Sequence, residues 1–369
     1  MLAVRSDVVG SLLRPPELLE ARGRFDRGEI GTSELRAAED AAVDGALRLQ
    51  EEAGLEVVTD GEMRRLSFQS QMTEAVEGFG EWDLDAFLWG EWRSDELGEL
   101  VVERPPIGVV GKLRRKRFLS ADEFTYAHSR TDRVLKVTLP SPSLFANFWD
   151  PERSTAAYGR LEEFLGDVAE ILREEVDELV RLGARYVQLD APHYPLLIDP
   201  GYRHFYESRG WPADRWLELG LELDNHVVGE REGVTFGFHL CRGNQASRWL
   251  VEGGYDWLAP RLFPKIRAGR LLLEYDDPRS GGFEPLAHVP EGKIAVLGLV
   301  TTKSGRRETV DELSARIGEA ARFLPLEQLA VSPQCGFATS VLGNALSFED
   351  EEAKLRTVAE TARAVWDAR

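Results

Sequence analysis

The chain has 369 residues, of which 43% are hydrophobic and 30% are charged, so it contains enough apolar material for the core of a globular protein. Its 64 acidic residues outnumber the 45 basic ones, and the net charge of -19 argues against nucleic acid and membrane surfaces as partners. The start of the chain is interrupted by Arg5, Asp7 and two prolines, which fits neither a secretory leader nor a membrane span. We therefore expect a cytoplasmic protein.

Short runs of aliphatic and β-branched residues alternate with helix-period segments along the chain. This alternation predicts βα units around a parallel sheet. Segment 158–183 predicts one of the helices, because its apolar residues recur every three or four positions. The predicted strands are 3–11, 55–62, 134–140, 184–192, 234–241, 270–277, 293–300 and 329–337. Eight strands with helical returns predict an α/β fold, a single (β/α)8 barrel of the TIM type over residues 1–369.

Four segments depart from this alternation. The strand-like stretch 106–120 predicts a hairpin inserted before the third barrel strand. Segments 79–105 and 192–217 are rich in Pro and Trp and predict long loops, which in barrels commonly surround the catalytic face. Residues 351–369 predict an amphipathic helix, and the sequence leaves both a monomer and an oligomer open.

Polar residues recur where the predicted strands end. The carboxyl ends of barrel strands meet at one rim, where barrel enzymes build their active sites, so we expect these residues to share a site. His239 and Cys241 stand two positions apart on one strand and therefore point to the same side. The full set is Ser11, Glu62, Asp190, His239, Cys241, Glu274 and Cys335.

The only two cysteines of the chain, Cys241 and Cys335, both lie at predicted strand ends. For either cysteine taken alone, the simpler explanation is that its side chain is buried in the core and only fills space there. Both, however, stand level with His239 and Glu274, and this mixture of nitrogen, sulfur and oxygen suits Zn²⁺, whereas calcium or magnesium prefers oxygen. Ligands drawn from distant strands are typical of a catalytic metal site rather than a structural one. The sequence therefore predicts a zinc enzyme.

Six motifs resemble, in their order along the chain, the catalytic barrel of cobalamin-independent methionine synthase, within the zinc-dependent thiol alkyltransferase group. They are VGSLLRP, VVTDGEMRR, VQLDAP, FHLCRGN, LLLEYDD and VSPQCGF. The resemblance runs from about residue 5 to the C-terminus. It implies a zinc-dependent S-methyltransferase similar to 5-methyltetrahydropteroyltriglutamate–homocysteine S-methyltransferase. Methyl transfer to homocysteine would give methionine.

The resemblance also implies roles for single residues. The implied zinc ligands are His239, Cys241, Glu274 and Cys335. Ser11, Glu62 and Asp190 match positions that hold homocysteine, with the two carboxylates facing its ammonium group. We expect as partners a small-molecule thiol of the homocysteine type and an alkyl donor. Full-length synthases carry an additional N-terminal barrel that helps to bind folate, so both a methyl-folate and a methyl-corrinoid stay open as the donor.

A second interpretation uses the same metal chemistry. Arg64 and Arg65 follow Glu62, and Arg242 follows Cys241, so cations stand near the predicted site. Such cations can hold an acidic substrate group, which makes Arg64 a candidate substrate-binding residue. In an epoxyalkane–coenzyme M transferase, the thiol that opens the epoxide carries a sulfonate. Coenzyme M has no ammonium group, so the carboxylates of the site favour an amino-acid thiol.

Asp190 and His193 are the candidate catalytic residues. His193 is a possible proton donor for ring opening, and a loop histidine without a role is the alternative. Tyr194 and Lys303 are similarly placed, and the sequence assigns them no role. A third interpretation is a non-catalytic barrel with a structural zinc, which predicts four saturated ligands and no exchangeable position.

Overall fold

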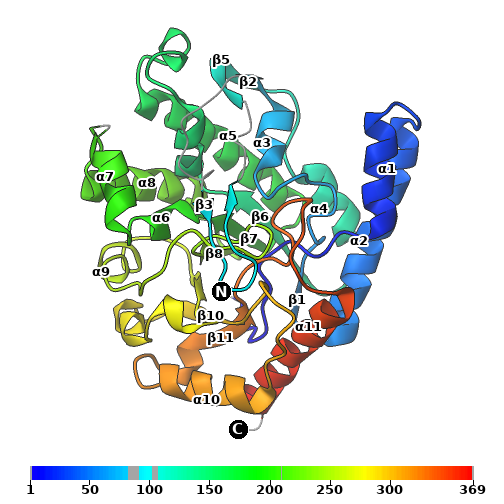
Figure 1. The fold of residues 1–369 in the computed structure, drawn as a ribbon, viewed down its shortest axis with the longest axis vertical. Helices are drawn as coiled ribbons and strands as arrows, with labels where there is room; N and C mark the ends of the chain where they lie inside the picture. The colour runs from blue at the N-terminus through cyan, green and yellow to red at the C-terminus, as the bar shows by residue number, and fades with distance from the viewer. Residues whose placement is uncertain (1, 82–90, 102–106, 209, 368–369) are drawn as a thin grey trace.

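A curled parallel sheet of seven strands forms the centre of the protein, in the order β1-β6-β7-β8-β9-β10-β11. The computed structural model describes residues 2–81, 91–101, 107–208 and 210–367. Figure 1 shows the strands at the centre and the helices around them. The strands are β1 (Val57–Val58), β6 (Val134–Pro140), β7 (Tyr186–Asp190), β8 (Thr235–Leu240), β9 (Arg270–Glu274), β10 (Ile294–Val300) and β11 (Leu329–Pro333). Nearly every residue in them is buried, as expected of a parallel sheet that is covered on both faces.

Amphipathic helices cover the outside of the sheet. In α5, the apolar residues Leu165, Val168, Leu172 and Val176 are buried at helical spacing, which confirms the helix predicted within 158–183. The helices are α1 (Pro16–Asp26), α2 (Thr32–Ala53), α3 (Ser70–Ala75), α4 (Ala121–His128), α5 (Leu161–Arg181), α6 (His193–Leu196), α7 (Pro200–Ser208), α8 (Ala213–Val228), α9 (Ala259–Leu262), α10 (Val310–Ala320) and α11 (Phe348–Ala362). Within the described residues, none of these helices combines the length and apolar character needed to cross a membrane.

The first predicted strand, 3–11, is not a regular strand, and this prediction was wrong. Ser6 makes a single parallel bridge to Val331 of β11. On the other side, the backbone N–H groups of Arg5 and Ser6 donate to the Glu56 carboxylate instead of to a neighbouring strand. The segment therefore lies beside β11 without forming an eighth strand of the sheet. Side-chain hydrogen bonds replace the ladder that a complete (β/α)8 barrel would have.

An antiparallel pair lies outside the main sheet. Strand β5 (Ile107–Arg115) confirms the strand-like character of 106–120, but its partner is β2 (Val76–Glu81), so among the described residues this stretch supplies one strand of the pair and not a hairpin of its own. A second small pair, β3 (Glu91–Trp92) with β4 (Leu100–Val101), lies in the segment predicted as a loop. The remaining parts of segments 79–105 and 106–120, namely 82–90 and 102–106, lie outside the described residues.

Segment 192–217 is not a loop, because it contains α6, α7 and the start of α8. Its aromatic residues explain this difference: Tyr206 stacks on Trp216 with ring centroids 5.0 Å apart, and both side chains are buried. At the other end of the chain, α11 confirms the predicted C-terminal helix, although it begins before residue 351. Trp366 packs partly against the main core and donates a hydrogen bond to the carbonyl of Leu326.

Candidate metal and thiol site

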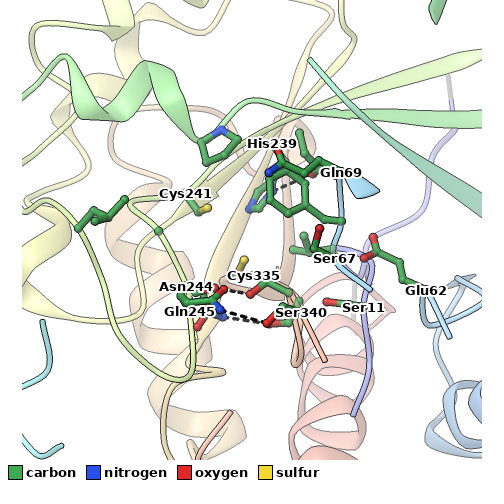
Figure 2. A pocket seen from close by; sticks show the side chains of 18 of the residues that line it. Ser11, Glu62, Ser67, Gln69, His239, Cys241, Asn244, Gln245, Cys335 and Ser340 are labelled. Atoms are coloured by element: carbon green, nitrogen blue, oxygen red, sulfur yellow. Dashed lines mark hydrogen bonds and ion pairs between the residues drawn. The ribbon is translucent and has the colours of Figure 1, made fainter. Parts of the chain in front are cut away.

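A cavity of about 330 Å³ lies where the central strands end. Asp190 is the last residue of β7, and Cys241 directly follows β8, so the sheet register itself brings them to this rim. Six of the predicted site residues line the cavity, and Figure 2 labels all of them except Asp190. These six are Ser11, Glu62, Asp190, His239, Cys241 and Cys335.

Three side chains converge in this cavity as a group of potential metal ligands. The ligand atoms of His239, Cys241 and Cys335 all lie within 4.8 Å of one another, and all three residues are buried. Both cysteines are free thiols. Nδ1 of His239 is 3.0 Å from Oδ1 of Asp190, so the carboxylate orients the ring, and Nε2 is 3.4 Å from the carbonyl oxygen of Gln334. An ion bound by Nε2 would replace that second, longer contact. One imidazole and two thiols form a donor set that suits zinc.

The electrostatics of this group favour a thiolate at Cys241 and a neutral thiol at Cys335. A hydrogen bond from Cys335 lowers the pKa of Cys241 to about 7, with a further contribution from the charge of His239. Burial by itself lowers the pKa of His239, but the charge of Cys241 and the hydrogen bond to Asp190 outweigh it, so the pKa is raised. As the donor of that hydrogen bond, Cys335 has a pKa well above the usual range. Cys241 is therefore the more acidic thiol of the pair.

Glu274, the predicted fourth ligand, does not belong to this group of three in the structure. Its Oε1 accepts a hydrogen bond from Lys303 Nζ at 2.9 Å, and its Oε2 accepts one from the backbone N–H of Arg242 at 2.6 Å. The carboxylate nevertheless lies near Cys241, because the N–H group it binds belongs to the next residue, Arg242. The structure thus assembles three of the four predicted ligands and places the fourth beside them.

Glu62 presents a buried carboxylate that is only half satisfied. Its Oε1 accepts a hydrogen bond from Thr138 at 2.7 Å and lies 3.5 Å from Arg65, whereas the buried Oε2 has no hydrogen-bond partner. The residue has a φ of 54°, a left-handed conformation that is strained for a side chain of this size. Burial raises the pKa of Glu62, Arg65 opposes this change, and the charge of Asp190 adds to it.

Asp190 and Ser11 complete the polar lining of the cavity. Oδ1 of Asp190 accepts hydrogen bonds from Gln188 and His239, so Oδ2 is the oxygen left for a ligand. Ser11 packs so closely against Gly336 that a Cβ atom there would collide with its hydroxyl group. A glycine at position 336 therefore lets the loop that carries Cys335 approach the first segment of the chain.

The predicted arginines point away from the cavity. Arg64 pairs with Asp40 and stacks over Tyr126, so it does not make the substrate contact predicted for it. Arg65 is held by Thr138 and Glu123. Arg242 donates to the carbonyl groups of Glu274 and Ser280. Each guanidinium is used to hold loops in place, and within the described part of the chain no Arg or Lys lines the cavity.

His193 lies outside the cavity lining, and its catalytic role stays a prediction. It begins α6 and is buried, with Nε2 2.8 Å from the hydroxyl of Ser143 and Nδ1 without a hydrogen-bond partner. Burial lowers the pKa of His193 to about 3, which favours the neutral ring. Tyr194 next to it donates a hydrogen bond to Asp224 at 2.6 Å and is equally buried. Both residues belong to a packed polar network.

Sequence reasoning missed the neutral side chains of the cavity. Asn244 donates from Nδ2 to Thr302 Oγ1 and to the carbonyl of Gly336, both at 3.0 Å. Gln245 donates to Ser340 at 3.1 Å, as the dashed line in Figure 2 shows. Asn244 ends the motif FHLCRGN, and this proximity to Cys241 was the signal that could have identified it. The remaining missed residues include Ser67, Phe68, Gln69 and Trp92.

Fold and site together define an α/β protein with a His–Cys–Cys group where its parallel strands end. The chain belongs to the family described as "Cobalamin-independent synthase, Catalytic domain", whose model matches residues 5–245 and 266–361. The resemblance noted in the sequence is thereby confirmed.

The relatives include both named and uncharacterized proteins. The chain is 34% identical over 365 residues to "Uncharacterized protein YxjH" of Bacillus subtilis, covering 98% of this chain and 94% of that protein. It is 27% identical to a protein named methionine synthase from Pyrococcus abyssi, covering 90% and 85%. A solved B12-independent methionine synthase from Shewanella sp. W3-18-1, in complex with selenomethionine, shares the fold with a TM-score of 0.75 and 20% identity, covering 99% and 98%.

Proposed function

We propose that this protein is a zinc-dependent S-methyltransferase that methylates the thiol of a homocysteine-type amino acid. The observation that carries the proposal is the joint placement of two features in one cavity: the His239, Cys241 and Cys335 group, and the carboxylates of Glu62 and Asp190. Family membership and relatives named methionine synthase support the reaction class. In the reaction, the substrate sulfur forms a bond to the methyl carbon, the bond between that carbon and its donor breaks, and the thiol proton is released.

Zinc fits the donor atoms that are present. Two thiols and one imidazole are buried together, and Glu274, which is bonded to the N–H of the residue after Cys241, is the proposed fourth ligand. When bound, zinc would lower the pKa of the substrate thiol and supply a nucleophilic sulfur at neutral pH. Asp190 would hold the ring of His239 in the orientation that binding requires.

The carboxylates favour an amino-acid thiol over a sulfonate thiol. Oε2 of Glu62 is a buried acceptor without a partner, and an ammonium group would supply the missing donor. Among the described residues, the cavity has no Arg or Lys side chain that could neutralise a sulfonate, and coenzyme M would meet Glu62 and Asp190 instead. Neutral groups such as Ser11 and Asn244 remain for the carboxylate end of the amino acid.

Burial of the site supports catalysis by excluding water from the reacting sulfur. The ligand group and Glu62 are almost inaccessible to solvent, while the cavity beside them is open enough to admit a small ligand. A purely structural zinc would not need this adjoining space. Phe68 and Trp92 line the same cavity, and both the methyl-folate and the methyl-corrinoid remain candidate donors.

A direct assay tests the proposed reaction. Zinc-loaded protein is incubated with L-homocysteine and either methyltetrahydrofolate or methylcobalamin, and methionine is measured by mass spectrometry. We expect methionine with one of these donors, and we expect Glu62→Gln to reduce its formation strongly because the ammonium loses a charged partner. Glu232→Gln, which changes an exposed glutamate, is the matched control and should retain activity. No product with either donor would contradict the proposal.

A further inference from the structure

Three charged side chains are buried together at the edge of the candidate metal centre. They are Lys303, Glu274 and Asp276, whose side chains are 7%, 3% and 0% exposed. Lys303 Nζ lies 2.9 Å from Oε1 of Glu274 and 3.8 Å from Oδ2 of Asp276. One cation thus stands between two carboxylates and makes a hydrogen bond to only one of them.

Asp276 is the unsatisfied member of this group. Neither of its oxygens has a hydrogen-bond partner of normal geometry, although the hydroxyl of Thr301 is near enough for a weak interaction. A fully buried carboxylate is costly without donors or an ion pair, and proteins rarely keep one without a reason. The nearest cation is Lys303, which is already committed to Glu274.

Lys303 holds Glu274 away from the ligand group. Oε2 of Glu274 accepts one hydrogen bond from the N–H of Arg242 and Oε1 accepts one from Lys303, and the carboxylate lies outside the group of three ligand atoms, so it must turn to reach an ion there. An ion at the His239–Cys241–Cys335 group would need one of these oxygens if Glu274 is the fourth ligand. Releasing Oε1 would leave the buried lysine without a partner unless a second carboxylate took its place.

We propose that Lys303 is a positioning residue that exchanges ion-pair partners: it holds Glu274 in the metal-free site and pairs with Asp276 when Glu274 turns to the metal. This inference rests on the proposed zinc site. The exchange requires Nζ to move by only about 1 Å to reach hydrogen-bond distance from Asp276, which a flexible lysine side chain allows. On this account, the oxygens of Asp276 lack a hydrogen bond because Lys303, the cation they would share, is bonded to Glu274.

The exchange predicts that the effect of Asp276 on zinc affinity depends on Lys303, whereas a simple charge effect of Asp276 would not. Any negative charge near a zinc ion favours binding, so the loss of Asp276 would weaken binding even without an exchange. In that case the effect would persist after Lys303 is removed. If Lys303 carries the effect, its removal abolishes the dependence on Asp276, and the two substitutions are not additive.

The test compares zinc affinity in four proteins by competition with a chelator: the wild type, Asp276→Asn, Lys303→Gln and the double variant. We expect Asp276→Asn to weaken binding about 10- to 100-fold, as is typical for residues that support metal ligands. We expect Lys303→Gln to bind at least as tightly as the wild type, and the double variant to match Lys303→Gln. Asp277→Asn is the matched control, because this neighbouring carboxylate pairs with Arg279 and should leave affinity nearly unchanged.

Two results would overturn the exchange. The first is an Asp276→Asn variant that binds zinc as tightly as the wild type. The second is an equal loss of zinc affinity when Asp276→Asn is made in the wild type and in Lys303→Gln. Either one would show that no partner is exchanged. Thermal unfolding of the metal-free variants checks that each one folds; Asp276→Asn removes a buried charge whose oxygens accept no hydrogen bond of normal geometry and should not be destabilised. Zinc bound by the wild type and lost in Cys335→Ser would support the metal site even if the exchange fails, whereas a wild type that binds no zinc would overturn both.

Discussion

Two groups of buried charges lie at opposite ends of the central strands, and they differ in how completely they are satisfied. At the amino ends, Asp7 accepts hydrogen bonds from Lys136 and Tyr186 and pairs with Arg270. At the carboxyl ends, Glu62 and Asp276 keep buried oxygens without partners. A completely paired network stabilises a fold, while unpartnered groups beside a cavity are typical of a site that awaits a ligand.

The difference also appears in the pKa values of the two groups. Burial by itself raises the pKa of Asp7, but the charges of Lys136 and Arg270 outweigh burial and the pKa falls below its usual value. For Glu62, burial dominates and the pKa rises. A buried carboxylate is therefore stabilised as an anion at Asp7, which faces two cations, and destabilised at Glu62, where burial outweighs the charge of Arg65.

The largest effect is expected from removing a metal ligand. Cys335→Ser should reduce the zinc content of purified protein from about one ion per chain to almost none, because a thiolate is lost from the buried ligand group. Elemental analysis of the protein measures this directly. Ser340→Ala changes a cavity residue outside the ligand group and serves as the control. Unchanged zinc content in Cys335→Ser would exclude this residue as a ligand.

At the opposite end of the strands, a substitution should affect stability alone. Asp7→Asn should lower the free energy of unfolding by about 3 to 5 kcal/mol, because it leaves Lys136 and Arg270 buried without their anion. Urea denaturation measures the change. Binding of homocysteine by the protein that remains folded should be close to normal. A stable Asp7→Asn variant would mean that this network is not the structural one.

Glu62→Gln should weaken substrate binding and leave stability unchanged, the reverse of Asp7→Asn. We expect homocysteine affinity to fall about 30-fold or more, which corresponds to ~2 kcal/mol for losing one partner of a buried charge pair. Stability should not fall, since Oε2 of Glu62 has no partner in the folded protein, a glutamine can keep the hydrogen bond from Thr138, and Arg65 keeps its ion pair with Glu123. Calorimetric titration and urea denaturation give the two values. Arg64→Gln is a useful comparison because this side chain faces Asp40, and a large loss of affinity there would contradict the geometry.

The smallest effect is the pH dependence of stability at the two ends. Asp7 has a lowered pKa, so its contribution is present at neutral pH and is lost as the pH falls through that pKa. Glu62 has a raised pKa, so its contribution is present at acidic pH and is lost as the pH rises through that pKa. Relative to wild type, Glu62→Gln should therefore gain stability as the pH rises, and Asp7→Asn should recover part of its deficit as the pH falls. Parallel curves for the two variants would contradict this assignment.

Much of the fold could be predicted because it depends on local pattern. The aliphatic runs that became β6, β7, β8 and β10 are short, buried and bounded by polar residues, so their position in the sequence was sufficient. The segment 3–11 shares this pattern but forms no regular strand. Its polar residues bind Glu56, Lys136 and other distant side chains, and no local pattern reports such contacts.

The candidate site shows the same division between local pattern and distant contacts. His239, Cys241 and Asp190 follow strand ends, and the sheet register alone brings them together. The orientation of His193 and Arg64, and the pairing of Glu274 with Lys303, depend on loops and on partners far away in the sequence. Chemistry that is carried by strand ends can be read from one sequence, whereas chemistry that depends on side-chain pairing needs the structure.

X-ray absorption at the zinc edge tests the central claim most directly. It counts the sulfur atoms around the metal in zinc-loaded protein alone, with L-homocysteine and with coenzyme M. We predict two sulfur ligands from Cys241 and Cys335, and one more when homocysteine is added but none with coenzyme M. An unchanged shell with homocysteine, or an additional sulfur only with coenzyme M, would contradict a methyltransferase that acts on an amino-acid thiol.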